Sequence, residues 1–225
     1  MARLMIVTDA WHPQVNGVVR TLDRLSQELG TLGFGVHLLT PEGFATVPLP
    51  SYPGIRSALA TVKAIADRIE ALDPDFIVAD ESVSALDVSI QAQVLNLLLD
   101  IRDRRGLTML FIAHDLSVVE YLCDSIAVMY LGRLVEVGSA DAVYSAPAHP
   151  YTRALLSAIP EPEPGASRGR ELLQGDIPSP LAPPSGCVFR TRCRFATPDC
   201  AQAIPPLTPF GDGRSAACIR LTEIS

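Results

Sequence analysis

The sequence predicts an α/β fold: a three-layer, mostly parallel, doubly wound sheet with an irregular Pro/Cys-rich C-terminal tail. Short apolar runs alternate with amphipathic stretches over residues 1–158, and strands that alternate with helices are typical of parallel sheets. Residues 159–225 show little periodicity and many prolines, which favours an extended tail over the domain. With 225 residues, of which 48% are hydrophobic, the chain is large enough to bury such a core.

The first segment, residues 1–75, is predicted to hold two strands and two helices joined by a proline-rich surface loop. Its strand candidates are short apolar runs, and its helix candidates have apolar residues at a spacing of three or four. The two strands are expected at residues 4–8 and 36–40, the two helices at residues 18–32 and 55–72, and the loop at residues 41–53.

The second segment, residues 76–158, begins with four apolar residues that lead directly into Asp80 and Glu81. A short apolar run that ends in charge predicts a buried parallel strand, and open α/β sheets bind ligands at the carboxyl ends of their strands. Asp80 would then hold Mg²⁺, and Glu81 would orient or deprotonate a water for phosphoryl transfer. The plainer alternative is a buried strand that happens to end in two acids.

The rest of this segment continues the alternation of helices and strands, and we expect it to extend the same sheet. An imidazole at the carboxyl end of a strand is a good donor to a phosphate oxygen, which makes His114 a candidate site residue; the alternative is a capping or core histidine. The expected elements are a helix at 89–105, strands at 107–113, 126–130 and 134–137, and a helical stretch at 139–158.

Residues 76–87, Phe-Ile-Val-Ala-Asp-Glu-Ser-Val-Ser-Ala-Leu-Asp, resemble the Walker B and D-loop segment of ATP-binding-cassette (ABC) ATPases. From there to about residue 220 the chain resembles the second half of the ATP-binding subunit of an oligopeptide/dipeptide importer. This includes His-Pro-Tyr-Thr-Arg at residues 149–153. One departure is Ser82, which stands where that family usually has proline.

The resemblance implies a role for each candidate residue of the ATPase-like segment. Asp80 would be the Mg²⁺ ligand, Glu81 the general base, Asp87 the D-loop contact and His114 the sensor of the γ-phosphate. The implied cofactors are ATP and Mg²⁺. The implied partners are membrane permease subunits and a second ATP-binding subunit.

The sequence lacks the parts of an ABC ATPase that bind phosphate. It contains no Gly-x-x-x-x-Gly-Lys-Ser/Thr, no Leu-Ser-Gly-Gly-Gln and no Q-loop, and its one lysine, Lys63, falls within a predicted helix. Phosphoryl transfer depends on positioning and electrostatics, which the phosphate loop supplies. The resemblance therefore implies ATP hydrolysis while the missing loop argues against it, and we expect a partial subunit that is not an autonomous ATPase.

Residues 3–75 resemble instead the N-terminal part of a retaining GT-B glycosyltransferase. In that family a glycine at the first turn lets the backbone approach the sugar-nucleotide phosphates, and Gly17 is the matching position; alternatively, Asn16-Gly17 is only a tight turn. An alternative function is therefore a sugar-nucleotide or acceptor-binding module. The two resemblances meet near residues 72–77, which would make the chain chimeric, by natural rearrangement or otherwise.

Four cysteines in the tail are spaced C-x₅-C-x₆-C-x₁₇-C: Cys187, Cys193, Cys200 and Cys218. Four thiols in a cytoplasmic chain favour a metal or cluster over disulfides, and the importer resemblance implies an iron–sulfur cluster in some members. Zn²⁺ is also compatible with four thiolates. We expect Arg190, Arg192 and Arg194 to lower the thiol pKa values. The alternatives are free or disulfide-bonded cysteines, or an inactive fusion whose only site is this cluster.

Charge and hydropathy exclude other classes of partner. The formal net charge of −7 argues against nucleic acid. No apolar run reaches the length of about 18 residues that a membrane-spanning helix needs. We therefore expect a cytoplasmic protein, or one that is peripheral on the inner face of the cell membrane.

Overall fold

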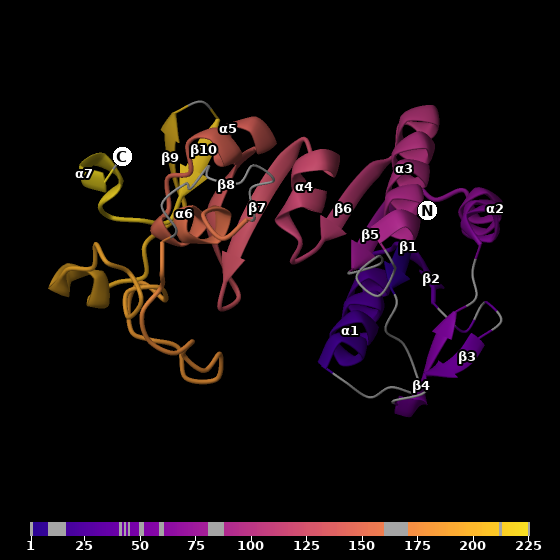
Figure 1. Cartoon of the computed structure of the whole chain (residues 1–225), viewed down its shortest axis with the longest axis horizontal. Coiled ribbons are helices and arrows are strands. Elements are labelled where there is room, and N and C mark those ends of the chain that lie inside the picture. The colour runs from indigo at the N-terminus through magenta and orange to yellow at the C-terminus, as the bar shows by residue number, and fades with distance from the viewer. Residues whose placement is uncertain are drawn as a thin grey trace. The chain divides into compact units, whose positions relative to one another are not determined.

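The structure is a computed structural model that divides into two compact units, Met1–His114 and Asp115–Ser225 (Figure 1). Each unit has a four-stranded sheet of its own, with strand order β2-β1-β5-β6 in the first and β7-β8-β10-β9 in the second. The residues that the structure describes are 2–8, 17–40, 42, 44, 46–49, 52–58, 61–80, 88–159, 171–211 and 213–224.

The sheet of the first unit is parallel throughout, as the sequence predicts. Its strands are β1 (Arg3–Thr8), β2 (Gly35–Leu39), β5 (Phe76–Asp80) and β6 (Thr108–Ile112). The helices of this unit are α1 (Gly17–Thr31), α2 (Val62–Leu72) and α3 (Val88–Arg105). The strands near 76–80 and 108–113 therefore do continue the sheet that begins in residues 1–75.

The core of the first unit lies on β1 and β5, the two central strands. Met5 and Ile6 of β1 are fully buried, and Ile77 of β5 is almost so. Leu22 of α1 packs on this sheet together with Leu4, Ile6 and Val78. Strands that are buried on both faces need continuous apolar runs, which is why β1 and β5 lack a clean alternation of polar and apolar residues.

The segment before α2 differs from the prediction. The expected loop at residues 41–53 contains β3 (Thr46–Leu49) and the start of β4 (Tyr52–Ala58), which pair antiparallel. The helix expected from residue 55 begins only at Val62, because Thr61 is its N-cap and accepts the backbone N–H of Ala64 at 3.2 Å.

The second unit is built on an antiparallel hairpin, and here the prediction of one continuous parallel sheet is wrong. β7 (Ser125–Tyr130) pairs with β8 (Arg133–Ser139) through a two-residue turn. Leu131 and Gly132 both have positive φ, 46° and 74°, as a type I′ hairpin turn requires. Such a turn fixes residues 126–130 beside β8 and antiparallel to it. The described residues form an α/β architecture with one parallel sheet and two antiparallel ones, of which β3-β4 is the smaller.

The C-terminal residues belong to the core of this unit, so the expectation of an irregular tail over the domain is not confirmed. β10 (Arg214–Ala216) pairs with both β8 and β9 (Thr208–Gly211). Phe189 is 1% exposed and packs in one cluster with residues of β7 and β8. The remaining elements are α4 (Leu116–Leu122), α5 (Ala140–Ser145), α6 (Pro150–Leu156), the 3₁₀ helix η2 (Pro198–Ala201) and α7 (Leu221–Ile224). None of the described helices is both long and apolar enough to cross a membrane.

Candidate functional site

Two of the predicted nucleotide-site residues lie at the carboxyl edge of the parallel sheet. Asp80 is the last residue of β5 and is half-buried, in register with Thr8 of β1 and Ile112 of β6. His114 follows β6 by two residues and is exposed. β5 and β6 are parallel neighbours, so their carboxyl ends meet at the same edge, as the sequence predicts.

The other predicted nucleotide-site residues are less well defined. Gly17 is the first residue of α1, so it stands at a helix start, and the loop before it lies outside the described residues. Glu81 and Asp87 also lie outside the described residues. The roles of all five residues therefore stay predictions.

The four cysteines of the second unit share one cavity. Cys187, Cys193, Cys200 and Cys218 all line a small space of about 20 Å³, room for about one water-sized sphere. Cys187 and Cys193 precede η2, Cys200 lies within it, and Cys218 follows β10. None is in a disulfide. The structure thus brings together residues that are 31 positions apart in the sequence.

A glycine makes the approach of the first and third cysteines possible. The Cys187 N–H donates to the Cys200 carbonyl at 2.8 Å, directly after Gly186, whose φ is +66°. A Cβ on Gly186 would lie 2.3 Å from the Cys200 carbonyl oxygen, well inside contact distance. Only glycine allows this turn to lie so close to the backbone at Cys200.

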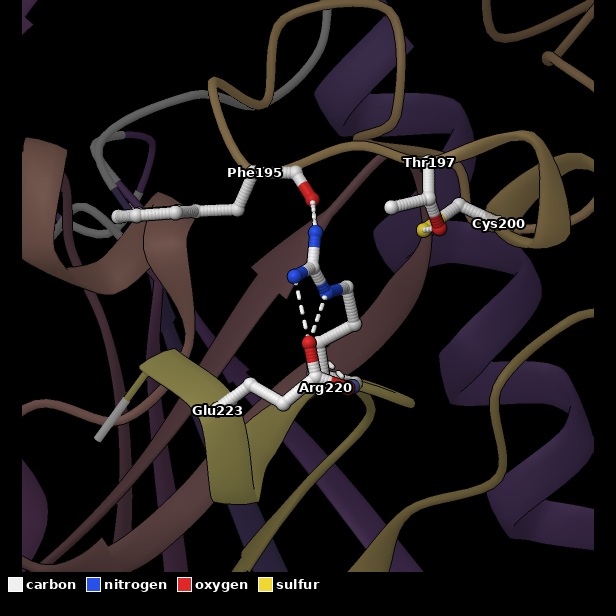
Figure 2. Close-up of polar contacts among 6 residues, drawn as sticks. Phe195, Thr197, Cys200, Arg220 and Glu223 are labelled. Atoms are coloured by element: carbon white, nitrogen blue, oxygen red, sulfur yellow. Dashed lines mark hydrogen bonds and ion pairs between the residues drawn. The ribbon is translucent and has the colours of Figure 1, made fainter.

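Two of the four sulfur atoms have a hydrogen-bond partner. The sulfur of Cys218 accepts the backbone N–H of Arg220 at 3.4 Å. The sulfur of Cys200 lies 3.6 Å from the Thr197 hydroxyl, as Figure 2 shows. Donors to sulfur stabilise the thiolate, the form that binds metals.

Arg220 fastens the chain around this cavity (Figure 2). Its guanidinium donates to the Phe195 carbonyl at 2.8 Å and to the Glu223 carboxylate at 2.9 Å. The segment after β10 is thereby tied both to the loop that carries Cys193 and to α7. The backbone N–H of Arg220 also donates to the Cys218 sulfur. Arg220 therefore contacts Phe195, Glu223 and Cys218.

The thiol pKa values differ from the sequence expectation. Burial raises the pKa of Cys193 to about 11 and also raises the pKa values of Cys187 and Cys218. Two of the arginines expected to lower them are engaged elsewhere: Arg190 donates to the Ser185 carbonyl and Arg194 pairs with Glu171. These thiols are therefore protonated at neutral pH, and a metal must displace their protons to bind.

The described side chains do not form a preorganised metal site. Within the part of the chain that the structure describes, no three His, Cys, Asp or Glu side chains are arranged to hold one ion. A tetrahedral zinc with Zn–S bonds of about 2.3 Å would need sulfur atoms roughly 3.8 Å apart. The thiols thus line one cavity, but the described side chains are not arranged as a structural zinc site.

The second unit also carries the sequence features of a known family. Residues 135–200 match the family described as oligopeptide/dipeptide transporter, C-terminal region. The matched region contains the first three cysteines of the cavity, while Cys218 lies beyond the matched residues.

Curated relatives support the match. A protein of Brucella ovis named as a peptide import ATP-binding protein is 63% identical over 68% of this chain and 48% of its own length. The dipeptide transport ATP-binding protein of Haemophilus influenzae is 53% identical over 67% and 46%. A peptide ABC transporter ATP-binding protein of Sinorhizobium fredii is 46% identical over 87% and 54%. This chain spans about half the length of these relatives.

The match to the Sinorhizobium protein bears on the first segment. Residues 76–225 are only two thirds of this chain, so a match that covers 87% of it extends into residues 1–75. The comparisons therefore favour the importer reading over the glycosyltransferase one. The fusion of the two families stays a prediction.

Residues 135–200 also contain two buried ionisable residues that the sequence analysis did not single out. Glu136 of β8 is fully buried and His149, the N-cap of α6, is 2% exposed. The two Glu136 carboxylate oxygens accept the backbone N–H groups of Ala148 and His149, at 2.8 Å and 2.9 Å. Burial lowers the pKa of His149 to about 4, so its ring is neutral. A charge inside the apolar run of β8 was the signal that could have pointed to this pair.

Proposed function

We propose that this chain is part of the ATP-binding subunit of a peptide ABC importer. The observation that carries the proposal is the match of residues 135–200 to the transporter C-terminal region. The relatives in peptide and dipeptide transport support it. The partners in this proposal are membrane permease subunits and a second ATP-binding subunit, at the inner face of the cell membrane.

In this proposal the carboxyl edge of the parallel sheet is the nucleotide side of the subunit. Asp80 holds Mg²⁺, Glu81 activates the attacking water and His114 contacts the γ-phosphate, while Asp87 contacts the second subunit. Mg²⁺ would neutralise charge on the phosphates of ATP. The position of Asp80 and His114 at one edge supports these roles.

We further propose that the chain does not hydrolyse ATP by itself. The support is chemical: the sequence has no phosphate loop and no signature motif, and carboxylates alone bind Mg·ATP weakly. Calorimetric titration of the chain with Mg·ATP should give no binding up to millimolar concentrations. Binding with a Kd near 1 μM, about −8 kcal/mol, that Asp80→Ala abolishes would contradict it. A sugar nucleotide titrated into the same sample tests the glycosyltransferase alternative and Gly17.

The four cysteines are the candidate cofactor site, and we propose that they bind an iron–sulfur cluster. The support is the number of cysteines, since four thiolates are the ligand set of such a cluster, and the one cavity that all four line. The hydrogen bond from the Arg220 N–H to the Cys218 sulfur supports thiolate ligation. Such a cluster would contribute stability or electron transfer to the region, and Zn²⁺ is the alternative occupant.

A further inference from the structure

A second pocket of the C-terminal unit lies next to the thiol cavity and is much larger. Its volume is about 400 Å³, within the range of about 300–1,000 Å³ that small-molecule sites occupy. The two spaces share Pro150 and Phe189 in their walls. Leu172 and Leu173 complete the apolar wall of the larger pocket. This wall offers a surface to the hydrocarbon part of a ligand.

The polar wall of the larger pocket holds Glu171, Arg192 and Arg194. Arg194 forms an ion pair with Glu171, with 2.9 Å between nitrogen and oxygen. The Arg194 guanidinium also lies over the Phe195 ring, 4.6 Å from the ring centroid. The charges of Glu171 and Arg194 cancel, so Arg192 gives the described lining of the pocket one net positive charge.

Arg192 is held in this wall without a carboxylate partner in the described part of the chain. Its Nε atom is shielded from solvent and has no hydrogen-bond partner there, and the residue as a whole is half-buried. Burial raises the pKa of the nearby Tyr151 hydroxyl, and the Arg192 cation acts against that rise. A cation that is partly removed from water and unpaired costs free energy, which a bound anion would offset.

The charges of the wall favour one kind of anion. A guanidinium binds a carboxylate through two parallel N–H···O bonds. The Glu171 carboxylate lies in the same wall and would repel a second negative charge on a ligand. A ligand with a single negative charge and an apolar group therefore matches both walls of the pocket.

We propose that this pocket binds a small carboxylic acid that carries an apolar group beside its carboxylate. The carboxylate contacts the Arg192 guanidinium, and the apolar group packs against Leu173 and Phe189. The inference uses neither the nucleotide edge nor the cysteines, so it does not depend on the functions proposed for them.

The probe is N-acetyl-L-leucine, and N-acetyl-L-leucinamide is its uncharged match, which differs only at the carboxylate. Both are titrated by calorimetry into the full chain in a buffer of low ionic strength. We expect the acid to bind with a Kd near or below about 1 mM. The amide should bind at least about tenfold more weakly, because it cannot form the charge-assisted hydrogen bonds. Inorganic phosphate should also bind more weakly than the acid.

Three variants test the role of Arg192. Arg192→Gln should weaken binding of the acid at least about tenfold and leave the weak binding of the amide unchanged. Arg192→Lys keeps the charge but loses the planar pair of donors, so its affinity should fall between the two. Arg133→Gln is the matched control, because Arg133 is an exposed arginine of β8 that does not line the pocket. This variant should bind the acid as the wild type does.

Four results would overturn the inference. A wild-type chain that does not bind the acid would reject the site. Equal affinities of the wild type for acid and amide would reject a carboxylate contact, and this comparison holds even where an arginine variant does not fold. Equal weakening by Arg192→Gln and Arg133→Gln would point to general charge attraction. Phosphate that binds as tightly as the acid and competes with it would reject selectivity for a carboxylate.

Discussion

The Glu136 carboxylate accepts the backbone N–H of His149 at 2.9 Å. This hydrogen bond joins the centre of β8 to the N-cap residue of α6. Glu136 is fully buried, and its second oxygen accepts the neighbouring N–H of Ala148. One strand residue thus supplies both acceptors for the turn that leads into α6. This contact fixes the backbone beside the cysteine cavity.

Replacing this carboxylate tests its structural role. Glu136→Gln turns one acceptor oxygen into an amide that faces a backbone N–H, so we expect unfolding to require about 2–3 kcal/mol less free energy. Urea denaturation followed by circular dichroism measures the change. Glu120→Gln, on the exposed side of α4, is the control and should stay within about 0.5 kcal/mol of the wild type. Equal effects of the two substitutions would contradict the role of Glu136.

Gly186 is expected to be indispensable for the cavity. Gly186→Ala combines positive φ with a Cβ that would meet the Cys200 carbonyl oxygen at 2.3 Å. We expect a loss of about 3 kcal/mol or more, the range of severe strain, together with loss of bound iron. Gly175→Ala is the control: its φ is +77° but nothing lies within 4 Å. This variant should lose only about 1–2 kcal/mol and keep its iron, and a matching loss of iron would argue against the steric explanation.

The raised pKa of Tyr144 predicts that the folded chain loses stability at alkaline pH. Its hydroxyl donates to the Leu116 carbonyl, and burial raises its pKa from 10.0 to about 12. The folded state therefore keeps this proton longer than the unfolded state does. Its contribution to stability is complete below pH 10 and is lost as the pH rises towards 12.

The test compares the wild type with Tyr144→Phe. At neutral pH the variant should be less stable by about 1 kcal/mol, the usual net value of one hydrogen bond. The difference should shrink in titrations above pH 10. A difference that does not depend on pH would mean that the hydroxyl ionises normally in the folded chain.

The proposed cluster predicts the iron content of the purified chain. Chain purified anaerobically and reconstituted with iron and sulfide should hold about four iron atoms per chain, the content of a [4Fe–4S] cluster. Cys200→Ser should lose most of the iron, whereas Cys123→Ser should keep it, because Cys123 does not line the cavity. About one zinc per chain and no iron would identify the alternative occupant.

Local pattern and topology predicted that Asp80 and His114 lie at one edge of the parallel sheet, because parallel strands that end in polar residues deliver them to the same edge. Asp80 and His114 could therefore be placed from the sequence alone. The pairing of residues 126–130 could not, since their alternation fits either sheet and the positive φ of Leu131 decides it. The hydrogen bonds of Glu136, the hydrogen bond of Arg190 to Ser185 and the ion pair of Arg194 with Glu171 depend on how the chain folds back on itself. A local sequence pattern does not predict such contacts.

The most direct test of the proposed function transplants this chain into a complete subunit. In a chimera, residues 76–225 replace the matching half of the Haemophilus dipeptide transport ATP-binding protein, whose own N-terminal half is kept. Uptake of labelled dipeptide is measured in cells that lack the native subunit. The account predicts uptake close to that of the native subunit, abolished by Glu81→Gln and strongly reduced by His114→Ala. A chimera that is stably produced and assembled with its permease but imports no dipeptide, or that is indifferent to Glu81→Gln, would contradict it.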